Sequence, residues 1–299
     1  MKKKGPFASA PNEIAFRAAV CAITAVILLL TAYPLYYVLI ASVSSQQHVM
    51  AGRVYFLPMG FTLEGYAELA GDGAILRGYA NTVFYALAGT ALGMAVTTPC
   101  AYALSRRDFW ARRWLMVFFL VTMFFSGGMI PTYLAITKTL GMGSGSLVMI
   151  VPFCLNVFNL IILRTYFETN LPRELWESAQ LDGCSNARYF AVVALPLSKA
   201  VLSVIMLYFL VGKWNDYFSG LLYIRDEKYL PLQNVLRSIL TRTEAMAGQF
   251  QSGTNIEALH RANLIKFSSI VASSMPMMAL YPFLQKYFEK GVMIGSVKG

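Results

Sequence analysis

Long apolar runs alternate with short polar connections along almost the whole chain. A helix that crosses a bilayer needs about 20 mostly apolar residues, and six runs approach or exceed this length. They lie near Ala15–Ala41, Tyr79–Leu104, Trp114–Ile136, Ser146–Tyr166, Leu197–Val211 and Leu264–Tyr287. Prolines fall inside or beside several runs, which membrane helices tolerate because neighbouring helices satisfy the freed backbone groups. The pattern therefore predicts an all-α membrane protein with six transmembrane helices.

The first apolar run follows the sequence MKKK and so resembles the start of a secretory signal peptide. The apolar part of a signal peptide is usually about 7–15 residues long. Here the run is longer, and it continues through Pro34-Leu-Tyr-Tyr. We therefore expect an uncleaved first span, with a cleaved leader as the alternative.

Composition supports the membrane assignment, because 57% of the residues are hydrophobic and only 13% are charged. An ordinary soluble domain has about 45–50% apolar and about 25% charged residues. The net charge of +10 would also suit a protein that binds nucleic acid. The basic residues lie beside the apolar runs rather than in one patch, however. This arrangement favours the positive-inside rule of membrane proteins over nucleic-acid binding.

Lysine and arginine gather in four regions at or beside the ends of the apolar runs: the N-terminal tail, the turn after the second run, the segment after the fourth run with its flanks, and the C-terminal end. These residues are Lys2, Lys3, Lys4, Arg17, Arg106, Arg107, Arg112, Arg113, Arg164, Arg173, Arg188, Lys199, Lys286, Lys290 and Lys298. With six spans all four regions lie on one side of the membrane, and the positive-inside rule makes that side the cytoplasm. We therefore expect cytoplasmic termini.

One cytoplasmic segment, ELWESAQLDGCSNARYFAVVALP, is unusually polar for this chain. Its glutamates Glu174 and Glu177 suit the positive end of a helix dipole. Gly183 is placed to end that helix in the left-handed conformation, and Ser185 is placed to cap a second helix. The segment therefore predicts two short helices joined at Gly183, running directly into the fifth span.

Two interpretations of this segment remain open from its residues alone. It could be an amphipathic linker at the membrane surface, or a docking site for a cytoplasmic partner. The small side chains of Ser178 and Ala179 permit close approach of another surface, and the carboxylates offer partners for lysine or arginine. These features favour docking without excluding the linker.

The same segment resembles the EAA loop of ABC-importer permeases, whose pattern is EAA, two residues, DG, and later a phenylalanine and LP. The matching residues are Glu177, Ser178, Ala179, Asp182, Gly183, Phe190, Leu195 and Pro196. Ser178 stands where the family usually has its second alanine, and Ala200 stands where a proline commonly follows LPLS. The resemblance covers nearly the whole chain and is similar to the maltose-transporter permeases. The segments FFSGGMIPTYLA and KYFEKGVMIGSVKG resemble the branch for complex oligosaccharides and polysaccharide fragments.

The resemblance implies a type I ABC importer permease fold in the bacterial plasma membrane. It implies a cytoplasmic tail at residues 1–14 and a permease domain at 15–299, with an EAA loop at about 167–196 and an outer loop at about 216–262. In that family the loop is a coupling helix that docks on a separate ATPase dimer, which binds ATP and Mg²⁺. Further implied partners are a second, non-identical permease, an extracytoplasmic sugar-binding protein that the outer loop contacts, and an oligosaccharide substrate.

Catalytic motifs are missing from the sequence. No GxxxxGK[ST] phosphate loop, HExxH motif or Ser/His/Asp arrangement occurs, and His48 and His260 are isolated. The four cysteines form no CxxC pair and predict no metal site. We therefore expect a transport subunit without a cofactor or metal of its own, rather than a membrane enzyme. A secondary transporter would need acidic residues for ion coupling inside the spans, and these are almost absent.

Polar residues within or beside the spans are candidates for the translocation path, because they are costly in a bilayer. They are Asn156 and Asn159 in the fourth run and Trp214, Asn215 and Asp216 after the fifth, with Asn81 and Thr82 as further candidates. A tryptophan that stacks on sugar rings beside amides and a carboxylate would suit an oligosaccharide. The alternative is that these residues are interface anchors and helix–helix hydrogen bonds.

Overall fold

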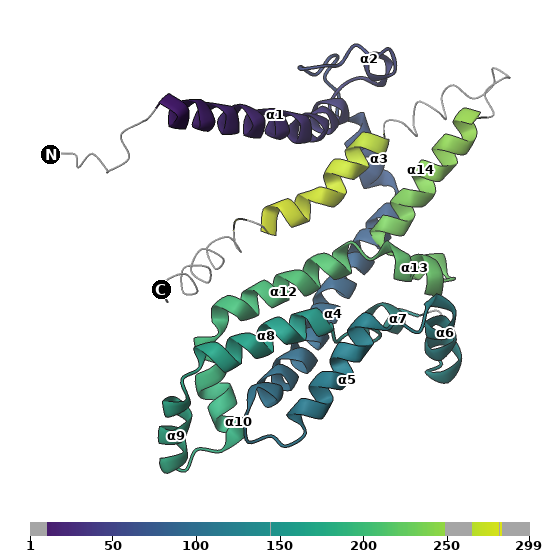
Figure 1. Ribbon diagram of the computed structural model, residues 1–299. Coiled ribbons are helices and arrows are strands. Elements are labelled where there is room, and N and C mark those ends of the chain that lie inside the picture. Colours follow the sequence, from purple (N-terminus) through teal and green to yellow (C-terminus); the bar gives the residue numbers. More distant parts are fainter. Residues whose placement is uncertain (1–10, 144, 249–264, 281, 283–299) are drawn as a thin grey trace. The chain divides into compact units, whose positions relative to one another are not determined.

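The computed structural model describes residues 11–143, 145–248, 265–280 and 282 (Figure 1). The chain divides into two compact units, residues 1–71 with 242–272 and residues 72–241 with 273–299. Residues 1–10 of the expected cytoplasmic tail, residues 249–262 of the outer loop and most of the C-terminal segment lie outside the described residues. Within the described residues the secondary structure is helical, with one isolated bridge between Ser44 and Phe61.

The helices follow one another in chain order with short connections. They are α1 (Pro11–Ser42), α2 (Gln46–Met50), α3 (Glu64–Gly71), α4 (Gly73–Ser105), α5 (Arg112–Phe124), α6 (Met129–Leu134), the π-helical turn η1 (Ala135–Thr139), α7 (Leu147–Ile150), α8 (Val157–Asn170), α9 (Arg173–Leu181), α10 (Asn186–Tyr189), the π-helical turn η2 (Phe190–Ala194), α11 (Leu195–Leu197), α12 (Lys199–Trp214), α13 (Tyr217–Tyr223), the 3₁₀ turn η3 (Glu227–Tyr229) and α14 (Leu232–Gly248). A further apolar helix covers Ile265–Leu280.

The first unit is built on α1, a helix of 32 residues that contains Pro34. Its apolar side chains are largely exposed, with Leu30 at 70%, as expected for a surface that lipid or another subunit covers. The turn after α1 is fixed by polar contacts, because the hydroxyl of Ser44 donates to the carbonyl of Ile40 at 2.6 Å. Ser45 Oγ and His48 Nδ1 form a hydrogen bond of 2.7 Å, which gives the isolated histidine a local structural role.

The second unit is organised around α4, which has 33 residues and packs against both α8 and α12 (Figure 1). Glycines on α4 allow this close approach. A Cβ atom at Gly93 would lie 2.8 Å from the ring of Phe209 on α12, and a Cβ atom at Gly89 would lie 3.0 Å from the side chain of Lys213. The buried core between the three helices includes Leu160, Leu163 and Ile205 among its members.

Two of the expected spans are continuous helices, and two are bent. Ala15–Ser42 and Gly73–Ser105 are each long and apolar enough to cross a membrane. The expected third span breaks between α5 and α6, and Arg112–Phe124 and Met129–Thr139 are bent by 115°. The helix of the expected fifth span, Lys199–Trp214, meets the preceding helical segment Asn186–Leu197 at a bend of 84°. The described residues thus hold two spans, or up to four with each bent pair taken as one, and the count of six stays a prediction.

The expected fourth span is also interrupted, between α7 and α8. Phe153 in this break has a positive φ of 61°, which is rare for a residue other than glycine. Asn156 restarts the helix, because its side-chain oxygen accepts a hydrogen bond from the backbone N–H of Asn159 at 3.2 Å. Pro152 and Asn156 are both typical of helix boundaries, so the interruption has a local sequence cause.

Candidate functional site

The polar segment after the fourth apolar run forms α9, which begins at Arg173. Arg173 and Glu177 form an ion pair one helical turn apart, with 2.9 Å between Nε and Oε1. Their side chains are 71% and 58% exposed, so the pair adds little to stability. Glu174 lies in the first turn, where a carboxylate favours the helix dipole. A helix of nine residues is marginal alone, so α9 depends on what packs behind it.

Gly183 ends α9 in the left-handed conformation that the sequence predicts, with φ of 71°. The N–H of Gly183 donates to the carbonyl of Gln180 at 3.0 Å, and the N–H of Cys184 donates to the carbonyl of Ala179 at 2.9 Å. These two bonds form a Schellman motif, which satisfies carbonyls that the helix end would leave free. A Cβ atom at Gly183 would meet nothing within 4 Å. Glycine is therefore favoured here by backbone conformation and not by lack of space.

The second predicted helix is also present, as α10. The hydroxyl of Ser185 accepts a hydrogen bond from the backbone N–H of Arg188 at 3.3 Å and caps this helix. The chain continues through η2 and α11 and then bends by 84° into α12. The segment is therefore helical from α9 to α12 except at the Gly183 turn and the bend, in agreement with the predicted pair of short helices that runs into the fifth span.

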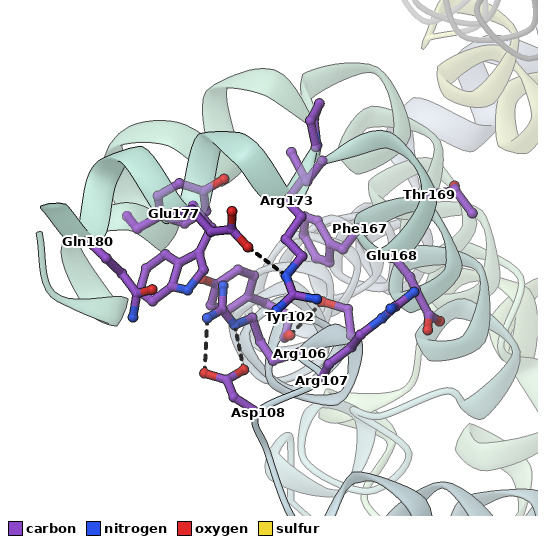
Figure 2. Close-up of a pocket in the computed structure, with 15 residues that line it drawn as sticks. Tyr102, Arg106, Arg107, Asp108, Phe167, Glu168, Thr169, Arg173, Glu177 and Gln180 are labelled. Atoms are coloured by element: carbon purple, nitrogen blue, oxygen red, sulfur yellow. Dashed lines mark hydrogen bonds and ion pairs between the residues drawn. The ribbon is translucent and has the colours of Figure 1, made fainter.

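Trp176 is the large side chain on the inner side of α9. The guanidinium carbon of Arg106, just after α4, lies 3.8 Å from the centroid of the Trp176 ring. Asp108 holds this guanidinium with two hydrogen bonds of 3.0 Å each (Figure 2). Those bonds also keep the pKa of the Asp108 carboxyl below its usual value. Trp176 packs edge-on against Tyr189 of α10, with ring centroids 5.0 Å apart.

A cavity of about 440 Å³ lies beside this contact, lined by the end of α4, the end of α8, α9 and α10. Figure 2 shows that the labelled aromatic rings Tyr102 and Phe167 and the charged groups of Arg107 and Glu168 all belong to its wall. Its charged lining residues are three arginines and three carboxylates: Arg106, Arg107, Arg173, Asp108, Glu168 and Glu177.

The outer side of α9 is open. The EAA-like residues Glu177, Ser178, Asp182 and Gly183 are exposed, whereas Ala179 is half-buried and packs towards the core. Sequence reasoning did not single out Leu181, whose side chain is 90% exposed. An apolar residue at the C-terminal end of α9, next to Asp182, was the available signal. The hydroxyl of Ser178 donates to the Leu175 carbonyl at 3.2 Å, so this serine fits the helix in place of alanine.

The residues expected to face the translocation path all have local structural contacts. Asn159 is buried next to the cap that Asn156 forms. Trp214 is 4% exposed, and its indole N–H donates to the Ser273 carbonyl at 3.1 Å. Asn215 donates from its side chain to the carbonyl of Val211 at 3.0 Å, and Asp216 accepts from the N–H of Ser219 at 3.0 Å. The structure thus brings the last three together at the corner between α12 and α13. Their part in a translocation path stays a prediction.

Asn81 and Thr82 also have structural partners. The side-chain amide of Asn81 donates to the carbonyls of Lys228 and Leu230 at 2.8 and 3.0 Å. The hydroxyl of Thr82 accepts from the backbone N–H of Leu232 at 2.8 Å. These bonds attach the segment before α14 to the start of α4, which matches the helix-anchoring alternative for these two residues.

The comparisons with known proteins agree with this architecture. Residues 89–294 match the family described as "Binding-protein-dependent transport system inner membrane component". The chain is 40% identical over 270 residues to Protein LplC of Bacillus subtilis, covering 90% of each chain. It is 37% identical over 272 residues to the polygalacturonan/rhamnogalacturonan transport system permease protein YtcP of the same organism, covering 91% of this chain and 94% of YtcP.

A solved structure gives the same result for the fold. The crystal structure of a bacterial ABC transporter involved in the import of the acidic polysaccharide alginate contains a chain that matches with a TM-score of 0.84. The two chains are 30% identical, and the match covers 95% of this chain and 99% of the other. The family match and these relatives show that the chain belongs to the inner-membrane permease components of binding-protein-dependent ABC transporters, as a sugar permease.

Proposed function

We propose that this chain is one of two non-identical permease subunits in an ATP-driven importer of an oligosaccharide or polysaccharide fragment. In this proposal it crosses the membrane six times with cytoplasmic termini, and it forms half of the translocation path. A separate ATPase dimer binds and hydrolyses ATP with Mg²⁺, and an external binding protein delivers the sugar. The identity of the relatives supports the substrate class, because YtcP is named for polygalacturonan and the alginate importer for an acidic polysaccharide.

The observation that carries the docking part of the proposal is the geometry of α9. The exposed residues Glu174, Ser178, Leu181 and Asp182 share one face of α9 and its C-cap, because Ser178 lies four residues after Glu174, and Leu181 and Asp182 lie three and four residues after Ser178. We call this set the docking face. Leu181 is 90% exposed, and burial of a leucine side chain contributes about 1.5–3 kcal/mol. A partner that covers Leu181 would gain this free energy, and the carboxylates beside it would pair with basic groups of the partner.

The connections of α9 support a role in coupling. One end continues from α8, and the other leads through the Gly183 turn into α12. Because α8 and α12 both pack against α4, displacement of α9 would be felt by three helices of the same unit. In this proposal Asn156, Asn159, Trp214, Asn215 and Asp216 line the path that these helices open.

Reconstitution tests the function directly. The chain is co-expressed with its partner permease and its ATPase, placed in proteoliposomes, and supplied with the binding protein. We expect ATP hydrolysis and uptake of labelled oligogalacturonides to rise together when binding protein and sugar are added. Omission of the ATPase is the control and should abolish uptake. Uptake that continues without the ATPase would contradict the proposal, because the chain would then transport on its own.

A further inference from the structure

The loop that follows α4 reaches α9 at one compact contact. The guanidinium carbon of Arg106 lies over the ring of Trp176, 3.8 Å from its centroid. The side chain of Arg106 is only 15% exposed. A cation over an indole ring is worth more when it is shielded from water in this way. The contact is therefore stronger than an ordinary surface ion pair.

Asp108 fixes the orientation of the Arg106 guanidinium. Its two carboxylate oxygens accept from Nε and Nη2, so the plane of the guanidinium is set by two parallel bonds. The planar guanidinium of arginine can donate two parallel hydrogen bonds to one carboxylate, whereas the ammonium group of lysine cannot. Asp108 lies on the turn between α4 and α5. The stack thus joins α9 to a fixed point and not to a freely rotating side chain.

An aromatic series continues inward from this stack. Trp176 contacts Tyr189, and the next residue, Phe190, lies 4.9 Å from Tyr102 on α4. Tyr102 in turn packs edge-on against Phe167 on α8, with centroids 5.9 Å apart. By contrast, the Arg173–Glu177 ion pair lies within α9 and links it to nothing else. The cavity of about 440 Å³ lies beside the stack, and Arg106 and Trp176 both line it.

We propose that Arg106 and Trp176 are positioning residues that transmit displacement of α9 to α4, so that ATPase closure moves the span. This inference rests on the proposed function of α9 as the docking helix. It assigns the transmission to the inner side of α9, whereas the docking face lies on the outer side. Loss of the stack should therefore leave docking intact and weaken the response of the transporter to sugar.

The test uses the full importer with four variants of this chain: Trp176→Leu, Trp176→Phe, Arg106→Gln and the double variant Trp176→Leu/Arg106→Gln. Arg107→Gln is the matched control, because Arg107 lines the same cavity without stacking on the tryptophan. Three quantities are measured: co-purification of the ATPase, the ratio of sugar-stimulated to unstimulated ATP hydrolysis, and sugar uptake.

We expect the ATPase to co-purify with every variant. The stimulation ratio should fall roughly 5-fold in Trp176→Leu and in Arg106→Gln, the order of effect for a partly shielded cation–π contact. The double variant should be no worse than either single one, because both remove the same contact. Trp176→Phe, which keeps an aromatic face, should fall between Trp176→Leu and the unsubstituted chain. Arg107→Gln should retain the full ratio.

Three results would overturn the inference. The first is an unchanged stimulation ratio in Trp176→Leu and Arg106→Gln. The second is losses that multiply in the double variant, since the two residues would then act separately. The third is loss of ATPase co-purification in Trp176→Phe and Arg106→Gln, which would make the stack part of docking. If the unsubstituted chain itself fails to bind the ATPase, the proposed function fails instead, and this control separates the two conclusions.

Discussion

The ammonium group of Lys213 donates a hydrogen bond of 2.8 Å to the backbone carbonyl of Met149. Met149 lies in α7, at the end of which the fourth apolar run is interrupted, and its side chain is almost fully buried. Helix ends leave carbonyls without intrahelical partners. A lysine from α12 therefore supplies one of the donors that the interruption requires, and Gly89 on α4 provides the space beside it.

Substitution of Lys213 by methionine should destabilise the chain, because the buried Met149 carbonyl would lose its donor. The expected cost is about 1–3 kcal/mol, and thermal unfolding of the detergent-solubilised importer measures it. Lys199→Met is the matched control, since Lys199 begins the same helix but is exposed. The control should change stability by less than about 0.5 kcal/mol. Equal effects of the two substitutions would contradict the role of Lys213.

Gly183→Val should impair coupling through strain at the turn. Both Gly183 and Gly52 have positive φ, 71° and 63°, and a Cβ atom at either would meet nothing within 4 Å. Valine should therefore cost about 1–3 kcal/mol of backbone strain at both positions, which makes Gly52→Val a matched control outside α9. We expect sugar-stimulated ATP hydrolysis to fall about 10-fold in Gly183→Val. A similar fall in Gly52→Val would show that the strain acts through general stability.

Leu181→Ser should weaken binding of the ATPase without changing the free energy of unfolding of the chain. The side chain is 90% exposed, so folding gains little from it, whereas burial under a partner would contribute about 1.5–3 kcal/mol. The dissociation constant of the ATPase should rise roughly 10–100-fold, since every 1.4 kcal/mol is about tenfold. Leu57→Ser, at a residue 74% exposed and far from α9 in the sequence, is the control and should bind normally. Normal binding by Leu181→Ser would remove Leu181 from the docking face.

The contribution of the Arg106–Asp108 pair to stability should not change in mild acid. Hydrogen bonds from Arg106 lower the pKa of the Asp108 carboxyl in the folded chain. A depressed folded pKa gives a stabilisation that is present above the unfolded value of about 3.9 and is lost as the pH falls through the folded pKa. The difference in melting temperature between the unsubstituted chain and Asp108→Asn should therefore be constant from pH 7 to about 4 and shrink below that. The difference should be small, because the Asp108 side chain is 59% exposed. A difference that shrinks already between pH 7 and 5 would argue against this carboxylate as its source.

The helix ends in α9 and α10 were predictable from the sequence, because capping and turn signals act within a few residues. Gly183 and Ser185 fall where the structure ends one helix and begins the next. The stack of Arg106 on Trp176 was not predictable in this way. The two residues lie 70 positions apart in the sequence (176 − 106), and neither belongs to a local spacing pattern that would bring them together.

The breaks in the apolar runs were not predicted from the sequence, for a different reason. Apolar residues continue on both sides of residues 125–128 and 151–156, so each run was expected to form one continuous span. The structure interrupts both. Gly128 with φ of 87° and Phe153 with φ of 61° mark the interruptions, and the nearby glycine and proline residues were the local signals. Whether such a residue bends a helix depends on the helices around it, which the sequence of one segment does not contain.

The π-helical turn η2, from Phe190 to Ala194, lies between α10 and α11, on the connection from α9 to α12. A π turn holds one residue more than the α-helical turn it replaces, and each residue of an α-helix advances the chain by about 100°. Loss or gain of one residue here would rotate Trp176 and the docking face around the axis of the following helix by about that angle. The length of the connection between Gly183 and α12 therefore determines the direction in which the docking face points. Under the proposed docking of α9 on an ATPase, a change of length here would turn the docking face away from its partner, so we expect relatives to tolerate changes of side chain here far better than changes of length.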